Sequence, residues 1–271
     1  MSVLLQISDT HFGTEQAPVV AALLRFARAQ QPSVVVWSGD ITQRARRAQF
    51  AAARRFADQL QAPQLLVVPG NHDIPLFNLA ARVAAPYANF KRVFGDALEP
   101  CIATPDWLVI GVNTTRAWRH KNGEVSRGQI DKVANQLRGA RPGQLKVVVV
   151  HQPVYVPLES DRGNLLRGHE AAMQAWGAAG ADVIMGGHIH LPYVIRQVVA
   201  RQNAEQTLWV VQAGTALSSR VRAGIPNSVN LIRQEAGAII ERWDFDGSQQ
   251  AFKLVSAIDT RASAAPLGRG R

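Results

Sequence analysis

Residues 3–11 read Val-Leu-Leu-Gln-Ile-Ser-Asp-Thr-His, an apolar run of strand length that leads directly into acidic and imidazole side chains. The same change recurs along the chain, at Gly39-Asp40, Gly70-Asn71-His72-Asp73, Asn113, His151 and His188-Ile189-His190. In an open α/β sheet the carboxyl ends of the strands line the ligand crevice. We therefore expect these polar groups to converge in space although they lie far apart in the sequence.

Six apolar runs have the Val, Ile and Leu content of strands buried on both faces. They are residues 3–8, 34–38, 65–69, 108–112, 146–150 and 183–186. Helical patterns separate several of them: Pro18 can open a helix, apolar residues repeat every three or four positions over 45–60, and Ser126-Arg127-Gly128-Gln129 has the form of a capping box. This alternation indicates an α/β fold with parallel strands.

The sequence pattern changes after residue 192, where strand-like runs are joined by turns that contain Gly, Asn and Asp. The runs are 193–199, 207–212, 228–233, 238–245 and 250–255. They indicate an antiparallel second sheet, so we predict a four-layer αββα sandwich of two mixed β-sheets flanked by helices, with these strands in the second sheet. We expect one domain over residues 1–255, followed by a basic, flexible tail at 256–271.

Composition limits the classes of protein to which the chain can belong. Its 271 residues are 47% hydrophobic and 18% charged, which is typical of a globular protein, and its net charge of +10 favours an anionic partner or substrate. Cys101 is the only cysteine, so any metal must use nitrogen and oxygen ligands. No apolar run approaches the ~20 residues that span a bilayer, and the first eight residues do not resemble a secretory signal. We expect a cytoplasmic protein without a transmembrane segment.

The polar groups at the strand ends form a ligand set of defined chemistry. Two carboxylates, one amide oxygen and four imidazoles can hold two metal ions that share one carboxylate, an arrangement suited to displacement at phosphorus. His72 is left free to donate a proton. Each group alone is more simply a turn residue or a core histidine. The recurrence of such groups at successive strand ends makes that reading of the whole set improbable.

The motifs resemble those of the calcineurin-like metallophosphoesterase superfamily over residues 3–192. They are D-x-H at Asp9 and His11, G-D at Asp40, G-N-H-D at Asn71, His72 and Asp73, a single His at His151, and G-H-x-H at His188 and His190. The resemblance implies two metal ions, Mn, Fe or Zn, with Asp40 as the bridge. It assigns Asp9, His11, Asp40 and His190 to one metal ion, and Asp40, Asn71, His151 and His188 to the other.

Within the superfamily, the short chain and the block Gly39–Thr42 resemble the bacterial branch that contains class III cyclic-nucleotide phosphodiesterases. The protein-phosphatase signature G-D-x-x-D-R-G fits worse, because Gln43 replaces the second Asp and Ala45 the final Gly, although Arg44 is retained. Gln152 stands where related diesterases usually have a second His. This departure leaves the metal ligands intact but changes the outer substrate contacts.

The groups around the metal ions are expected to handle the substrate. His72 would donate a proton to the departing oxygen, and Asp73 would either orient its ring or complete the turn. Asn113 and Arg116 follow a strand end that should open into the same crevice, where Arg116 can bind a phosphate oxygen. Arg44 lies four residues after the bridging carboxylate and is a further candidate.

These observations predict a dinuclear phosphohydrolase acting on a small anionic phosphate ester. We favour a phosphodiester, because a phosphomonoester carries more charge and few cationic groups are expected beyond the metal ions. The alternatives of the same fold are a phosphomonoesterase, a lipid-diphosphate hydrolase and a nuclease, although no extended basic and aromatic groove favours nucleic acid. A non-catalytic scaffold is disfavoured because all ligand positions are retained. The natural substrate and the oligomeric state stay open.

Overall fold

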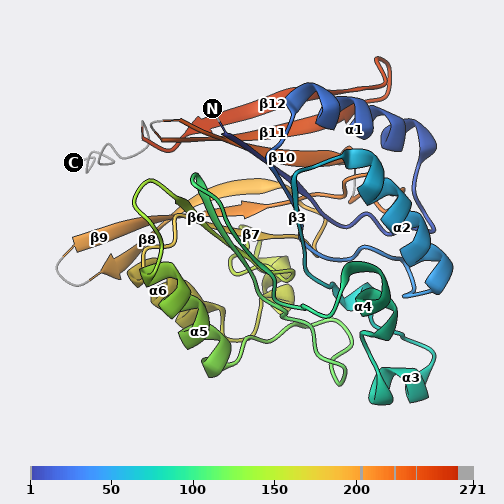
Figure 1. The fold of residues 1–271 in the computed structure, drawn as a ribbon, viewed down its shortest axis with the longest axis horizontal. Helices are drawn as coiled ribbons and strands as arrows, with labels where there is room; N and C mark the ends of the chain where they lie inside the picture. Colours follow the sequence, from blue (N-terminus) through green and yellow to red (C-terminus); the bar gives the residue numbers. More distant parts are fainter. Residues whose placement is uncertain (1, 202–203, 223, 236, 262–271) are drawn as a thin grey trace.

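The chain folds into four layers, helices outside and two β-sheets inside (Figure 1). The computed structural model describes residues 2–201, 204–222, 224–235 and 237–261. The predicted αββα sandwich of two mixed sheets is therefore confirmed. Among the described residues, no helix combines the length and the apolar character needed to cross a membrane.

Among the described residues each sheet has six strands, with the parallel strands along one side of the first sheet and in the centre of the second. Listed in order across it, the first sheet consists of β12 (Ala251–Asp259), β11 (Ala238–Asp246), β10 (Ser228–Gln234), β1 (Ser2–Ile7), β2 (Val34–Trp37) and β3 (Gln64–Val67). The second consists of β4 (Cys101–Ala103), β5 (Trp107–Gly111), β6 (Leu145–Val149), β7 (Val183–Gly186), β9 (Ala204–Gln212) and β8 (Tyr193–Arg201). The strands β1–β3 are parallel, as are β5, β6, β7 and β9.

The structure describes six α-helices, and the three that were predicted, over 17–30, 47–60 and 127–138, begin near their predicted signals. The six helices are α1 (Ala17–Gln30), α2 (Arg47–Leu60), α3 (Leu79–Ala84), α4 (Ala88–Phe94), α5 (Arg127–Arg138) and α6 (His169–Ala178). Pro18 lies in the first turn of α1, where its missing N–H costs no helical hydrogen bond. Ser126 caps α5 by accepting from the backbone N–H of Gln129. These local predictions are confirmed.

The predicted placement of the strands after residue 192 is wrong. We expected all of them in the second sheet, but β8 and β9 join β7 in that sheet while β10–β12 extend the first sheet from β1. An alternation of apolar residues indicates a strand but does not indicate which strand it pairs with. In this structure β10 pairs antiparallel with β1, beginning with Ser2 opposite Gln234.

The predicted boundary at residue 255 also needs correction. Strand β12 continues to Asp259, because its backbone pairs with β11 as far as Ile239↔Asp259. Composition alone does not reveal this pairing. The remainder of the expected tail, residues 262–271, lies outside the described residues.

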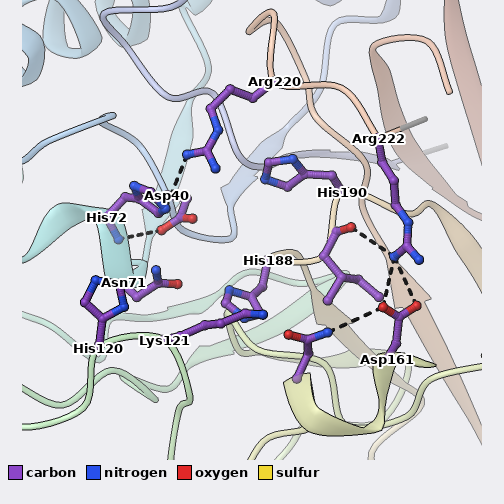
Figure 2. A pocket seen from close by; sticks show the side chains of 12 residues that line it. Asp40, Asn71, His72, His120, Lys121, Asp161, His188, His190, Arg220 and Arg222 are labelled. Carbon is purple, nitrogen blue, oxygen red and sulfur yellow. Dashed lines mark hydrogen bonds and ion pairs between the residues drawn. The ribbon is translucent and has the colours of Figure 1, made fainter. Parts of the chain in front are cut away.

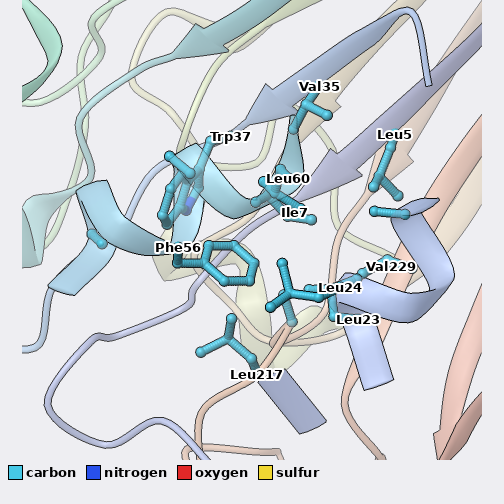
Figure 3. Packing of buried hydrophobic residues seen from close by; sticks show 14 of the residues in the cluster. Leu5, Ile7, Leu23, Leu24, Val35, Trp37, Phe56, Leu60, Leu217 and Val229 are labelled. Atoms are coloured by element: carbon cyan, nitrogen blue, oxygen red, sulfur yellow. The ribbon is translucent and has the colours of Figure 1, made fainter. Parts of the chain in front are cut away.

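Three buried apolar clusters occupy the three spaces between the layers. Leu5, Trp37 and Phe56 belong to the cluster between the first sheet and α1, α2 and α4 (Figure 3). Leu4, next in sequence to Leu5, belongs to the cluster between the two sheets, because successive strand residues face opposite sides. Trp176 of α6 packs in the cluster on the outer side of the second sheet. The two sheets are thus held face to face, with the carboxyl ends of their parallel strands exposed at one edge.

Candidate metal centre

The seven predicted ligand residues all follow the carboxyl ends of parallel strands. They are Asp9 and His11 after β1, Asp40 after β2, Asn71 after β3, His151 after β6, and His188 and His190 after β7. Because β1–β3 and β6–β7 belong to different sheets, the cluster forms only where the two sheets meet. Beneath it, the Gln6 amide donates to Ser38 Oγ and to the carbonyl of Gly186, at 3.0 Å each, and so ties the sheets together.

The first half of the cluster contains two carboxylates and two imidazoles. Donor atoms of Asp9, His11, Asp40 and His190 all lie within 4.8 Å of one another. His190 Nε2 is 3.3 Å from Asp9 Oδ1, and His11 Nε2 is 3.8 Å from Asp40 Oδ2. The Nε2 atoms of His11 and His190 face each other at 3.1 Å, as two ligands of a common cation would.

The second half shares Asp40 with the first. Donor atoms of Asp40, His151 and His188 again lie within 4.8 Å of one another. His151 Nε2 lies 3.2 Å from Asp40 Oδ1 and 3.2 Å from Asn71 Oδ1. The structure therefore brings together all seven predicted side chains, in the two sets that the resemblance implied.

Unpartnered buried nitrogens test whether this cluster fits a metal ion. Both ring nitrogens of His188 and Nδ1 of His11 are buried without a hydrogen-bond partner among the described residues. Burial lowers the pKa of each of these histidines to about 3, so both are neutral at neutral pH and keep a lone pair for a cation. Neutral imidazole is the form that binds metals. The donor set thus fits divalent metal ions.

The charges on Asp40 and His151 support the same reading. Burial opposes the ionised form of both groups, but their hydrogen bond and mutual attraction lower the pKa of Asp40 well below its usual value and raise that of His151 to about 9. The protein therefore places positive charge beside the shared carboxylate. A divalent cation supplies such charge in place of the proton, which protonated His151 must lose to become a ligand.

The backbone at the cluster is strained. Positive φ angles occur at five of the seven candidate ligands: Asp9 (50°), His11 (42°), Asp40 (47°), His188 (76°) and His190 (57°). Side-chain-bearing residues rarely adopt this conformation, which costs of order 1–3 kcal/mol each and collects at functional sites. Hydrogen bonds between neighbouring strand ends hold it, for example from the Asp9 N–H to the carbonyl of Gly39 at 3.1 Å.

His72 lies beside the cluster, as predicted. Its backbone N–H donates to Asp40 Oδ1 at 2.9 Å, and its Nδ1 is 3.0 Å from the carbonyl of Gln43. Since that carbonyl only accepts, Nδ1 carries a proton. The other ring nitrogen, Nε2, faces the cavity and lies 3.3 Å from Nη1 of Arg220, a group that only donates. In this arrangement Nε2 is an acceptor, so a proton-donating role requires that this hydrogen bond break.

Asp73 does not orient the ring of His72. Its buried carboxylate accepts from the backbone N–H groups of Ile41, Thr42 and Gly70 at 2.8 to 3.0 Å. It therefore fastens the turn after β3 to the turn after β2, and the second of our two expectations for it, completing the turn, agrees with this geometry. Burial and the nearby charge of Asp40 raise the pKa of Asp73 to about 6.

The predicted substrate-binding residues are not together. Arg44 lines a small recess beside His72, with its guanidinium 5.4 Å from the ring centre of Phe77. Asn113 and Arg116 instead line a separate cavity with Trp118. The Asn113 side chain accepts from Thr115, and Arg116 donates to backbone carbonyls and to Gln129. These bonds hold the loop after β5 away from the metal cluster, so neither residue lines the cavity at the cluster.

The cavity over the cluster, of about 460 Å³, contains charged residues that we did not predict. They are Arg220 and Arg222 from the loop after β9, Lys121, and Asp161 (Figure 2). Arg220 and Arg222 follow the carboxyl end of a strand parallel to β7, so the rule that located the ligands also covers them. We missed them because we expected β9 to pair antiparallel with its neighbours, whereas it runs parallel to β7.

The fold occurs in structures that share little sequence with this chain. A dimetal phosphatase from Danio rerio has a TM-score of 0.61 at 13% identity, over 95% of this chain and 98% of that one. A purple acid phosphatase from yellow lupin has a TM-score of 0.66 at 11% identity, over 95% of this chain and 53% of that one. Vacuolar protein sorting 29 from Cryptosporidium parvum has a TM-score of 0.50 at 13% identity, over 96% and 98%. At these identities the likeness shows the fold alone.

Sequence comparison is more specific. A search of curated proteins gave no match. The sequence model of the calcineurin-like phosphoesterases matches residues 2–192, which is well over half of the 271 residues. That segment carries all seven side chains of the cluster together with His72. The chain therefore belongs to the calcineurin-like phosphoesterase family.

Proposed function

We propose that this protein is a dinuclear metal-dependent hydrolase of small phosphate esters. The observation that carries the proposal is the pair of overlapping donor sets that share Asp40, with unpartnered imidazole nitrogens buried among them. Asp9, His11 and His190 would hold one ion with Asp40. Asn71, His151 and His188 would hold the other ion with the same carboxylate.

The bound ions and the protein would divide the chemistry. Two divalent ions lower the pKa of water to about 7 and neutralise charge on phosphoryl oxygens. Mn, Fe and Zn all suit imidazole and carboxylate ligands. The chain itself would orient the ester within the cavity and present His72 Nε2 to the departing oxygen. The strained turns support this division, because they hold the donors in place before substrate arrives.

The class of ester is the finer part of the proposal. A phosphodiester was favoured from sequence because few cationic groups were expected near the metal ions. The cavity contains Arg220 and Lys121, so that argument loses its premise. We therefore propose a phosphoric ester hydrolase without restricting its substrate to diesters.

Metal analysis and hydrolysis assays on the same purified protein test the function. We expect about two equivalents of bound Mn, Fe or Zn, and hydrolysis of p-nitrophenyl phosphate, bis(p-nitrophenyl) phosphate or both that is abolished by a chelator and restored by metal. Protein that binds two ions but hydrolyses no ester in a broad phosphate-ester screen would reject the proposal.

A scaffold without catalysis is the alternative from another class. The same fold occurs in a protein named for vacuolar protein sorting and in a dimetal phosphatase, so the fold alone does not identify an enzyme. The retained ligand set and the cavity above it favour the enzyme. Failure to bind metal in the assay above would favour the scaffold.

A further inference from the structure

Arg220 places a cationic side chain directly at the candidate active site. It lies in the loop between β9 and β10, and it lines the same cavity as Asp40 and His190. Its Nη1 is 3.3 Å from His72 Nε2 and donates to Gln43 Oε1 at 3.0 Å. Figure 2 shows the guanidinium directed toward His72 and the shared carboxylate. The arginine therefore faces the position expected for a bound phosphoryl group.

Arg220 makes no ion pair with a carboxylate among the described residues. Both of its side-chain partners among the described residues, Gln43 and His72, are hydrogen-bond acceptors without a carboxylate. Arg222, two residues later, differs: its Nη1 is bound to both carboxylate oxygens of Asp161 at 3.0 and 3.1 Å. Arg222 joins its loop to the 3-10 helix Glu159–Asn164, whereas Arg220 carries its charge into the cavity without an ion pair to any described carboxylate. Such a charge suits an anionic ligand.

The loop that carries Arg220 is held in place by its own backbone contacts. The carbonyl of Arg220 accepts from Thr215 Oγ1 at 2.9 Å, and its N–H donates to Ser218 Oγ at 3.3 Å. The Asn227 amide donates to the carbonyls of Thr215 and Ser218 at 3.2 and 2.8 Å. The guanidinium is thus presented from an ordered support, which lowers the entropic cost of binding a ligand.

The number of free oxygens distinguishes the two classes of ester. A phosphodiester has two non-esterified oxygens and one negative charge, and two metal ions can compensate both oxygens. A phosphomonoester has a third such oxygen and nearly two charges at neutral pH. The third oxygen needs a donor outside the metal ions, and a guanidinium binds phosphate oxygens through paired N–H groups.

On the basis of the proposed function, we infer that Arg220 binds this third oxygen and that the substrate class is phosphomonoesters. His72 and Gln43 position the guanidinium until the phosphate replaces them as its acceptor. This inference reverses the preference for diesters that the sequence suggested.

Substitution of Arg220 by Gln tests the inference with two readouts on the metal-loaded protein. For p-nitrophenyl phosphate, we expect kcat/KM of the wild-type protein to exceed that for bis(p-nitrophenyl) phosphate, and Arg220→Gln to lower it on the order of 10- to 100-fold. For the diester we expect a change below about threefold. Calorimetric titration with inorganic phosphate should show a matching loss of affinity, and Arg220→Lys should recover part of both.

Controls separate this inference from folding and from the proposed function. Arg127→Gln, at an arginine of α5 whose side chain is 83% exposed, is the matched arginine variant away from the cavity and should change neither readout. Metal content and melting temperature should be the same in all variants. Equal losses for both esters, or unchanged phosphate affinity in Arg220→Gln, would overturn the role of Arg220. If the wild-type protein hydrolysed neither ester, nor any other ester of the broad screen, the proposed function would be rejected, and phosphate titration would still decide what Arg220 binds.

Discussion

Asp40 is the residue on which both halves of the cluster depend. Its Oδ2 lies 3.8 Å from His11 Nε2, its Oδ1 lies 3.2 Å from His151 Nε2, and it is fully buried. We predict that Asp40→Ala reduces the content of both metals and lowers kcat/KM by at least about a hundredfold, because loss even of outer-shell partners costs 10- to 100-fold. Metal analysis by mass spectrometry checks this. A variant that kept both ions would show that Asp40 is not shared.

His72 lies close to Asp40 but belongs to neither donor set. We predict that His72→Ala keeps both ions while kcat falls on the order of 10²- to 10⁴-fold, as expected for loss of a general acid. The fall should be steepest for esters with poor leaving groups, which need protonation. Rates for a series of aryl and alkyl esters, compared with metal content, provide the measurement. Loss of metal would instead assign His72 to the ligands.

At the level of elements, the close approach of two turns decides the geometry of the site. The turn after β3 passes so near the turn after β2 that a Cβ on Gly70 would lie 2.0 Å from the backbone nitrogen of Asp40. Asp73 ties the same turns together by accepting from two backbone N–H groups of the turn after β2, those of Ile41 and Thr42. The absence of a side chain at residue 70 is therefore a condition for the position of the shared carboxylate.

Gly70→Ala adds only one methyl group, but we expect it to disturb the site. We predict a loss of unfolding free energy of about 1–3 kcal/mol, as for an overpacked interior, together with reduced metal content. Gly128→Ala in the first turn of α5 is the matched control, since a Cβ there meets nothing within 4 Å and should be neutral or stabilising by up to about 1 kcal/mol. Chemical denaturation of both variants measures the difference. Equal stability would mean that the turns move apart freely.

At the scale of the whole molecule, the segment that carries the family motifs is not a complete fold. The family match ends at residue 192, but β9 continues the second sheet beside β7, and β10–β12 continue the first beside β1. Val229 and Phe252 belong to the cluster that packs under α1. A chain without the last five strands would therefore expose two sheet edges and an apolar face.

We predict that a chain ending at Pro192 shows no cooperative thermal transition. A chain ending at Arg261 keeps every described strand and should unfold cooperatively, as the full-length protein does. Differential scanning calorimetry of the three proteins makes the comparison. A cooperative transition in the shorter chain would show that β8–β12 are dispensable for folding.

Most of the site was predictable because it is encoded locally. Each ligand directly follows an apolar run, and a run of Val, Ile and Leu becomes a strand wherever it packs. The carboxyl ends of parallel strands in one sheet then share one edge, so the grouping of Asp9, Asp40 and Asn71 after β1, β2 and β3 follows from sequence order. The helix starts at Pro18 and Ser126 were predictable for the same reason, since capping depends on residues within one turn.

Only the tertiary structure decided which strands pair and what lines the cavity. Alternating apolar residues make β10 a strand without indicating that its partner is β1, because pairing joins segments far apart in the sequence. The position of Arg220 beside His72 depends on β9 lying next to β7. The position of Arg116 away from the metal cluster depends on hydrogen bonds within its own loop. The sequence by itself therefore determined the candidate ligands and the fold class, because both depend on short-range patterns. The assignment of strands to sheets and the positions of the cationic groups depend on long-range packing, which a local sequence pattern does not reveal.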